Sequence, residues 1–262
     1  MKWDPAQYLQ FADQRGRPFQ DLMARVGSTG DIHPSYVVDL GCGPGNLTAG
    51  LSDRWPDADI EGVDSSAEMI DRAQQDNARD GVRFSVGDLR DWAPTRAVDV
   101  LTSNATLQWV PGHLDLLERL VGFLAPGGWF AFQVPGNFGE PTHTELAAVR
   151  TSPRWQPILG DLDLPQPAVE EPVAYVRRMT DLGCAVDAWE TTYLQVLPGP
   201  DAVLEWMKGT GLRPVLSALD EEQQAEFVAE YAERLRVAYP QESFGTVLPY
   251  RRIFVVATRG AG

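Results

Sequence analysis

The sequence has little cysteine or histidine. Its 262 residues include two cysteines, Cys42 and Cys184, which are far apart in the chain, and three scattered histidines, His33, His113 and His143. Neither set has the spacing of a zinc site or of a disulfide framework. We therefore expect two free thiols in a reducing compartment and no bound metal.

Basic residues and long apolar runs are also scarce. The chain carries 22 Lys and Arg against 37 Asp and Glu, which gives a formal net charge of -15. Nucleic acids and anionic membrane surfaces are bound through basic patches, so we expect neither as a partner. No apolar run approaches the about 18 residues of a membrane span, and the opening MKWDPAQYLQ lacks the apolar core of a secretion signal. These absences predict a cytoplasmic protein.

The chain does have a regular alternation of strand-like and helix-like segments between residues 35 and 134. The pattern predicts strands at residues 36–40, 58–64, 82–86, 98–104 and 129–134, and helices at residues 46–55, 65–75 and 113–124. Such alternation is typical of a doubly wound α/β sheet. Ser65 and Glu68 have capping-box spacing, which predicts that the second helix begins directly after Asp64.

This alternation ends after Val134. Residues 135–171 are rich in proline and irregular, and they are too many for a tight connection. Beyond them the pattern predicts helices at residues 172–183, 201–207 and 220–238, and strands at residues 184–197 and 252–258. We therefore expect a single domain over residues 1–262, with a seven-stranded sheet. A helical cap from residues 1–20, 136–182 and 198–249 is expected to cover its active site.

The first strand runs into a loop that has glycine at every second position, at Gly41, Gly43 and Gly45. Residues without a Cβ let a ligand approach the backbone closely. A dinucleotide-binding loop needs its third glycine at position 46, where this chain has Asn46, and Pro44 removes one of the amides that would bind a diphosphate. Asp39 would repel a diphosphate and attract an ammonium group. The loop therefore indicates a different nucleotide-like ligand.

Acidic residues also end the next two strands. Asp64 is placed to accept both hydroxyls of a ribose, because ligands of such folds collect at the carboxyl ends of the strands. Asp88 would accept the exocyclic amino group of adenine, with Met69 and Leu89 as apolar walls. The ligand that combines these features is a nucleoside with a cationic tail and no phosphate, and S-adenosylmethionine fits that description.

Four stretches, VVDLGCGPGNLT, GVDSSAEMI, VGDLRDW and NATLQWVPGH, resemble the successive motifs of class I S-adenosylmethionine-dependent methyltransferases. The resemblance covers about the middle half of the chain. It implies a Rossmann-like fold and S-adenosylmethionine as cofactor, with S-adenosylhomocysteine as product. The residues expected to bind the cofactor are Asp39, Gly41, Gly43, Asp64, Ser65, Met69, Asp88, Leu89 and Asn104.

Further stretches, WDPAQYLQFADQRGRPF, VPGNF, WETTYLQVL and PYRRIF, resemble a narrower family, the trans-aconitate 2-methyltransferases. This resemblance spans nearly the whole chain, with residues 145–171 as its least motif-like part. It implies methylation of a carboxyl group of a small polycarboxylate, with trans-aconitate as the expected acceptor, to give a monomethyl ester. We expect a monomer or a weak homo-oligomer.

A carboxylate acceptor is already ionised at neutral pH, since its reference pKa is about 4, so no general base is needed. Trp109 follows the fourth strand, and its indole N–H could hold one oxygen of the reacting carboxylate. Resemblance to carboxyl methyltransferases implies Gln14 as the second member of this clamp. Arg251 and Arg252 could neutralise the other carboxylates, and neighbours in an extended segment point oppositely, so we expect only one of them to do so. Further candidates are Arg15, Arg17 and Arg213.

Two other interpretations remain open. The same clamp would suit a carboxyl methyltransferase that acts on a malonyl thioester of a carrier protein or on a fatty acid. The chain could also bind S-adenosylmethionine without catalysing a reaction. Methyl transfer to a panel of organic acids would distinguish these functions.

Overall fold

The structure, a computed structural model, describes residues 12–260 apart from residues 29, 161 and 163–168, and for residues 12–15 it describes the backbone alone. The chain forms two compact units. The first comprises Met1–Val134, Ala168–Glu190 and Ile253–Gly262, and the second comprises Pro135–Pro167 and Thr191–Arg252.

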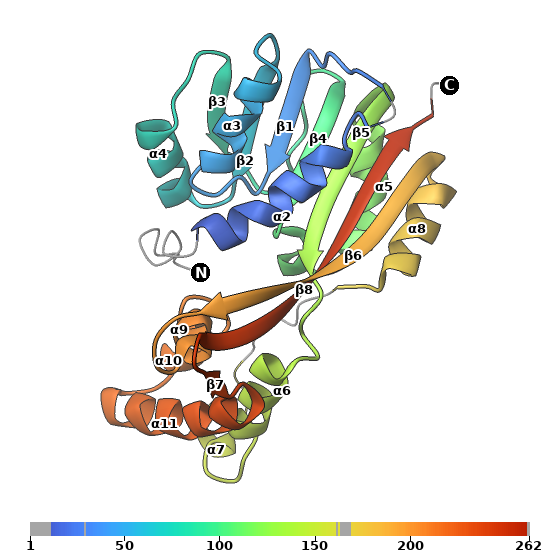
Figure 1. Ribbon diagram of the computed structural model, residues 1–262. Coiled ribbons are helices and arrows are strands. Elements are labelled where there is room, and N and C mark those ends of the chain that lie inside the picture. Colours follow the sequence, from blue (N-terminus) through green and yellow to red (C-terminus); the bar gives the residue numbers. More distant parts are fainter. Residues whose placement is uncertain (1–11, 29, 161, 163–168, 261–262) are drawn as a thin grey trace. The chain divides into compact units, whose positions relative to one another are not determined.

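One sheet contains the strands β1 (Tyr36–Leu40), β2 (Asp59–Asp64), β3 (Val82–Val86), β4 (Val98–Asn104), β5 (Leu124–Pro135), β6 (Cys184–Leu197) and β8 (Gly245–Arg259), in the order β3-β2-β1-β4-β5-β8-β6. Of these, β1 to β4 belong to the first unit, as does β5 up to Val134, while β6 and β8 have residues in both units. The pairs from β3 through β5 are parallel, and β8 runs opposite to its neighbours (Figure 1). The two-residue strand β7 (Gln241–Glu242) pairs with β8. The predicted doubly wound sheet is confirmed, with the seven strands of this order joined by β7 as an eighth.

Helices before, between and after the parallel strands cover both faces of this sheet (Figure 1). They are α2 (Ala12–Arg25), α3 (Asn46–Arg54), α4 (Ala67–Asp76), α5 (His113–Gly122), α8 (Pro172–Asp181) and the short 3-10 helix η1 (Leu107–Trp109). Figure 1 shows α2 in front of the strands and α5 behind them. Strands enclosed in this way are buried on both sides, and every residue of β1 is indeed buried.

The first turn of α4 differs from its prediction by one residue. The N-cap is Ser66, whose hydroxyl accepts a hydrogen bond from the Met69 amide at 3.3 Å. The predicted capping box of Ser65 and Glu68 was therefore wrong. The physical reason is that Asp64 accepts the Ser66 amide at 2.9 Å, which carries the chain one residue further before the helix begins.

The apolar core of the first unit explains why α8 belongs to it. Tyr175 and Met179 of α8 are completely buried in the cluster that also holds Leu101 and Phe132 of the sheet. The Tyr175 hydroxyl lies 2.8 Å from Nε2 of His113 in α5. This helix thus packs on the sheet, although it lies within the range 136–182 that the sequence predicts to be cap.

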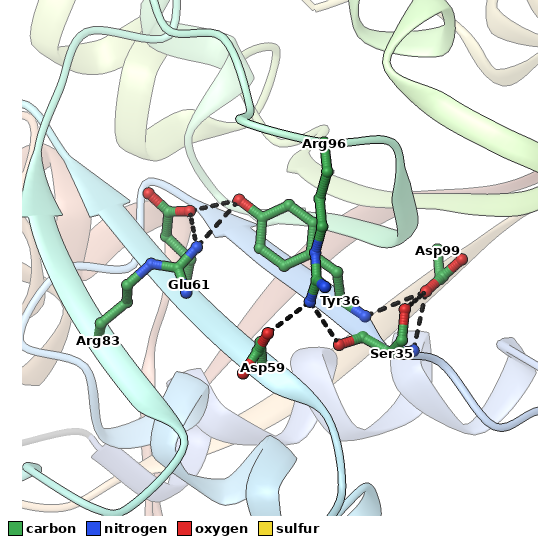
Figure 2. Close-up of polar contacts among 7 residues, drawn as sticks. All are labelled: Ser35, Tyr36, Asp59, Glu61, Arg83, Arg96 and Asp99. Atoms are coloured by element: carbon green, nitrogen blue, oxygen red, sulfur yellow. Dashed lines mark hydrogen bonds and ion pairs between the residues drawn. The ribbon is translucent and has the colours of Figure 1, made fainter.

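A polar network binds the amino-terminal ends of the strands together (Figure 2). The hydroxyl of buried Tyr36 hydrogen-bonds to Glu61, and its ring has the guanidinium groups of Arg83 and Arg96 at 5.3 and 4.8 Å. Burial and the contact with Glu61 raise the pKa of Tyr36 to about 12. Asp99 accepts the backbone amide of Tyr36 at 3.0 Å. Polar groups at this edge thus bond to one another, while the opposite edge of the sheet carries the glycine loop.

The second unit contains α6 (Pro141–Arg150), α7 (Gln156–Leu159), α9 (Ala202–Lys208), α10 (Arg213–Leu216) and α11 (Glu221–Ala238). Helices near residues 201–207 and 220–238 were predicted, whereas α6 lies in the stretch predicted to be irregular. Proline occupies the first turn of α6, where it favours a helix start because no amide is needed there. The helix is fixed by α11, whose Tyr231 hydroxyl donates to the Thr142 carbonyl at 2.6 Å. The covering role of residues 1–20, 136–182 and 198–249 remains a prediction.

No helix in the described part of the chain combines the length and the apolar character needed to cross a bilayer.

Candidate active site

The loop between β1 and α3 depends on glycine for two different reasons. Gly41, Gly43 and Gly45 all have left-handed backbones, with φ of 79°, 55° and 80°. A Cβ on Gly41 would lie 2.0 Å from Oγ1 of Thr106, and one on Gly45 would lie 2.6 Å from Cε1 of Phe84, so a side chain at either position would collide with its neighbours. A Cβ on Gly43 would meet nothing within 4 Å. The loop is therefore packed tightly at both ends and open at its middle, where a ligand can approach the backbone.

Asp64 fixes this loop to the end of β2. One carboxylate oxygen accepts the Gly43 amide and the other accepts the Ser66 amide, each at 2.9 Å. An ionised carboxylate has about four acceptor positions, so these two bonds leave capacity for a ligand's hydroxyls. The neighbouring Ser65 is exposed.

Asp39 places a second acidic group beside the loop. Its side chain is buried, with 3% of the residue exposed, and one of its oxygens accepts the Thr48 hydroxyl at 2.6 Å. Burial is the main cause that raises the pKa of Asp39 to about 7, and the negative charge of Asp64 adds to it. A cation bound near the loop would lower the pKa of Asp39 again, because a nearby positive charge favours the ionised carboxylate.

We expect Asp39→Asn to stabilise the protein above neutral pH in the absence of ligands. Since the pKa of Asp39 is raised from 3.8 to about 7 in the folded state, its favourable contribution is complete below about pH 4 and is lost as the pH rises to about 7. The asparagine variant should therefore exceed the wild type in free energy of unfolding at pH 8, with no difference near pH 4. Urea denaturation at both pH values measures this, and a less stable variant at pH 8 would contradict the assignment.

The chain turns sharply where β4 ends. Ala105 has a left-handed backbone with φ of 54°, a conformation that costs roughly 1–3 kcal/mol outside glycine and tends to occur at functional sites. Its amide donates to the Gln133 carbonyl at 2.9 Å, and its carbonyl accepts Nε2 of buried Gln108 at 2.7 Å. The preceding Asn104 has a buried Oδ1 without a hydrogen-bond partner among the described residues. Trp109 follows in η1, with 38% of its surface exposed.

The carboxylate of Asp88 accepts hydrogen bonds from a neighbouring arginine. Arg90 donates from Nε to Oδ1 at 2.9 Å, and these hydrogen bonds lower the pKa of Asp88 to about 2. An adenine amino group would thus share this carboxylate with a guanidinium. Met69 and Leu89 are buried, and Leu89 belongs to the core of the sheet.

The residues expected to hold the acid lie in both units. Gln14 falls on α2, but its side chain and that of Arg15 lie outside the described residues. Arg17 is on the same helix and forms an exposed ion pair with Asp21 at 3.9 Å. Arg213 begins α10 in the second unit.

The adjacent Arg251 and Arg252 of β8 have different surroundings in the second unit. Arg252 is 6% exposed, and its guanidinium lies 4.4 Å from the ring centre of Tyr250. Arg251 is less buried, and its Nη1 donates to the Gly136 carbonyl at 3.4 Å.

The structure thus brings the loop glycines, Asp39 and Asp64 together at one edge of the sheet, with Thr106 from the turn after β4 against Gly41. Sequence reasoning missed Thr48, Thr106 and Gln108, which support these groups by hydrogen bonds or packing. Their residue types are common in helices and turns, and only the pairing of β1 with β4 shows that Thr106 meets Gly41.

Comparison with known proteins finds methyltransferases. The family described as methyltransferase domain matches residues 37–128, which include the glycine loop and Trp109. Trans-aconitate 2-methyltransferase from Streptomyces avermitilis is 51% identical, over 99% of this chain and 97% of that protein. The enzyme of the same name from Mycobacterium tuberculosis is 45% identical, over 98% and 97%.

Solved structures with a similar fold have much lower identity. The YcgJ protein from Bacillus subtilis aligns with a TM-score of 0.60 and 13% identity, over 94% of this chain and 100% of that one. Phosphoethanolamine N-methyltransferase 2 from Haemonchus contortus, in complex with S-adenosylhomocysteine, aligns with a TM-score of 0.56 and 14% identity, over 93% and 52%. These similarities concern the fold alone.

Proposed function

The chain belongs to the trans-aconitate 2-methyltransferase family, and from this membership we propose that it methylates one carboxylate of trans-aconitate with S-adenosylmethionine. The products are a monomethyl ester and S-adenosylhomocysteine. Identity of 45% to 51% over nearly the full length of both chains carries this proposal. This similarity also covers the second unit, and we therefore propose the acid substrate as well as the cofactor.

Residues of the first unit fit the cofactor. Gly43 leaves the middle of the loop open to a ligand. Asp39 and Asp64 supply two carboxylates, for a cation and for hydroxyl groups. The buried Oδ1 of Asn104 has no hydrogen-bond partner among the described residues. We assign to cofactor binding Asp39, Gly41, Gly43, Asp64, Ser65, Met69, Asp88, Leu89 and Asn104. When bound, S-adenosylmethionine supplies an activated methyl group on a sulfonium.

The chain's own contribution to the reaction is alignment. The attacking carboxylate needs no proton removed at neutral pH, so the protein has to hold the acid in a reactive position and exclude water. Holding reactants in near-attack geometry is worth up to roughly 7–11 kcal/mol of the barrier. We propose that Trp109, together with Gln14, holds the reacting carboxylate.

Arg252 is assigned to a carboxylate that does not react. Its guanidinium is buried beside Tyr250, and a planar fork of donors matches a carboxylate bidentately. Arg251 is the poorer candidate, because it is less buried and donates to the backbone of Gly136.

The direct test is methyl transfer from labelled S-adenosylmethionine to a panel of acids, with the ester identified by mass. Fast transfer to trans-aconitate, and slow transfer to fatty acids and to malonyl carrier protein, supports the proposal. Tight cofactor binding without transfer to any acid would favour a non-catalytic role. We also propose that the enzyme works in the cytoplasm, in keeping with Cys42 and Cys184, which are both free and buried.

We expect Asp64→Ala to weaken the binding of S-adenosylmethionine by about 1–3 kcal/mol, the usual cost of leaving paired polar groups unsatisfied. The substitution also releases the Gly43 and Ser66 amides, so part of the loss comes from the loop. Asp64→Asn should lose less, because the carboxamide oxygen still accepts one amide. Calorimetry with S-adenosylhomocysteine measures both affinities, and unaltered affinity in the alanine variant would refute the assignment.

A further inference from the structure

The side chain of Gln108 bonds to the strained turn that leads from β4 into η1. Ala105 in this turn has φ of 54°, and it is one of two non-glycine residues with a left-handed backbone among those that the structure describes. Gln108 donates from Nε2 to the Ala105 carbonyl at 2.7 Å, while the Ala105 amide donates to the Gln133 carbonyl at 2.9 Å. Both backbone polar groups of the strained residue are therefore bonded, one to β5 of the sheet and the other to Gln108.

The carboxamide of Gln108 is costly where it lies. The residue is 3% exposed, and its Oε1 has no hydrogen-bond partner among the described residues. A buried acceptor left unpaired destabilises a fold, and an apolar side chain of the same length would fill this position without that cost. Within the described part of the chain, the bond to Ala105 is the one hydrogen bond that this side chain makes.

The alanine at position 105 also lowers stability. Glycine adopts a positive φ about as readily as a negative one, whereas alanine is strained there. Two features that destabilise the fold, the left-handed Ala105 and the unpaired oxygen of Gln108, thus occur at one turn. Costs of this kind tend to be retained where function requires a particular geometry. The turn leads directly into Trp109, whose amide donates to the Thr106 carbonyl at 3.0 Å.

We propose that Gln108 is a positioning residue: by bonding to Ala105 it keeps this turn left-handed and thereby fixes the direction in which η1 presents Trp109 to the acid. This inference rests on the proposed function, in which Trp109 holds the reacting carboxylate. Without the bond, Ala105 can relax to the more favourable negative φ, which redirects the backbone that follows it. Displacing a reacting group by about 1 Å can slow a reaction about 10²-fold.

The test is a double-mutant cycle in the full-length protein, followed by single-turnover kinetics at saturating trans-aconitate. Gln108→Met keeps the length of the side chain and removes its hydrogen bonds, and we expect the rate to fall about tenfold, as for the loss of one hydrogen bond. Ala105→Gly should keep the wild-type rate within about twofold, because glycine adopts the same φ without strain. In the Ala105→Gly background, Gln108→Met should slow the reaction only about two- to threefold. An equal loss in both backgrounds would overturn the inference.

Leu107→Met is the matched control, because Leu107 is a completely buried neighbour in η1 that packs in the apolar core. It disturbs the packing of η1 and leaves the bond to Ala105 in place, so any loss of rate should be the same in the wild-type and Ala105→Gly backgrounds. Calorimetry should find wild-type affinity for S-adenosylhomocysteine in Gln108→Met. A fall of that affinity in parallel with the rate indicates a general structural role and would contradict positioning.

Fluorine NMR of protein labelled with fluorotryptophan tests the turn without any turnover. The Trp109 signal is the one that is missing from Trp109→Phe. We expect this signal to shift or broaden in Gln108→Met and to return towards its wild-type position in the double variant, and an unchanged signal in Gln108→Met would refute the inference. Failure of the wild type to methylate trans-aconitate would instead overturn the proposed function, and since the NMR result does not depend on that activity, the two failures are distinguishable.

Discussion

Replacing Arg252 with methionine should lower kcat/KM for trans-aconitate by about 10²- to 10³-fold, because truncating one partner of a buried charge pair costs roughly 2–5 kcal/mol. Arg252 is 6% exposed, so its guanidinium interacts with an anion under little screening by water. Methionine retains the length and the packing of the arginine stem without its charge. The loss should appear mainly in KM for the acid, since Arg252 is assigned to a carboxylate that does not react.

Arg251→Met is the control for this variant. It removes the same charge from the adjacent position, but Arg251 lies on the other face of β8 and donates to Gly136. We expect its KM for the acid to change less than about threefold, as is usual for a charge at the rim of a binding site. Steady-state kinetics at saturating cofactor measure both values. Equal losses in the two variants would show that overall charge, and no specific contact, attracts the acid.

The position of the glycine loop beside Asp64 could be predicted from the sequence, because these residues lie at fixed places in the strand pattern, whereas their binding of the cofactor stays a prediction. The carboxyl ends of the strands in a parallel sheet lie at one edge, and the order of the motifs therefore predicts that Gly43 lies next to Asp64. The hydrogen bond between these residues agrees with that expectation. The left-handed backbone of all three loop glycines follows from the same turn.

Side-chain pairing was harder to foresee. Asp88 was predicted as an acceptor for adenine, but Arg90 lies two residues away and already donates to it. Ser65 was predicted to begin α4, yet the contact between Asp64 and the Ser66 amide shifts the start by one residue. Sequence spacing does not decide between competing local hydrogen bonds of this kind, and the contact of Asp88 with adenine stays a prediction.

The choice between Arg251 and Arg252 depended on contacts that are distant in sequence. Alternation along a strand predicts that only one of them faces the acid, and the burial of Arg252 in the folded chain favours Arg252. α6 was missed for a related reason. It lies in a proline-rich stretch with a weak helical pattern, and it is stabilised by α11, where Tyr231 bonds to Thr142, 89 residues away in the sequence.

Replacing Trp109 with alanine should lower kcat by about 10²-fold or more, the loss expected when a reacting group is misplaced by about 1 Å. Affinity for S-adenosylhomocysteine should not change, because Trp109 is assigned to the acid. With 38% of its surface exposed, Trp109 contributes less packing than a core tryptophan, so the free energy of unfolding should change little. Single-turnover kinetics and calorimetry measure these two effects separately.

Trp109→Phe distinguishes hydrogen bonding by the indole from packing by its ring. Phenylalanine retains an aromatic surface but has no N–H, so we expect it to lose nearly as much kcat as alanine if the indole holds a carboxylate oxygen. Wild-type turnover in this variant would show that Trp109 acts by shape alone. The strained turn at Ala105 favours the loss of kcat in Trp109→Phe. A left-handed alanine held by Gln133 and Gln108 fixes the backbone that leads into η1, and such precision serves a directional bond better than a hydrophobic contact.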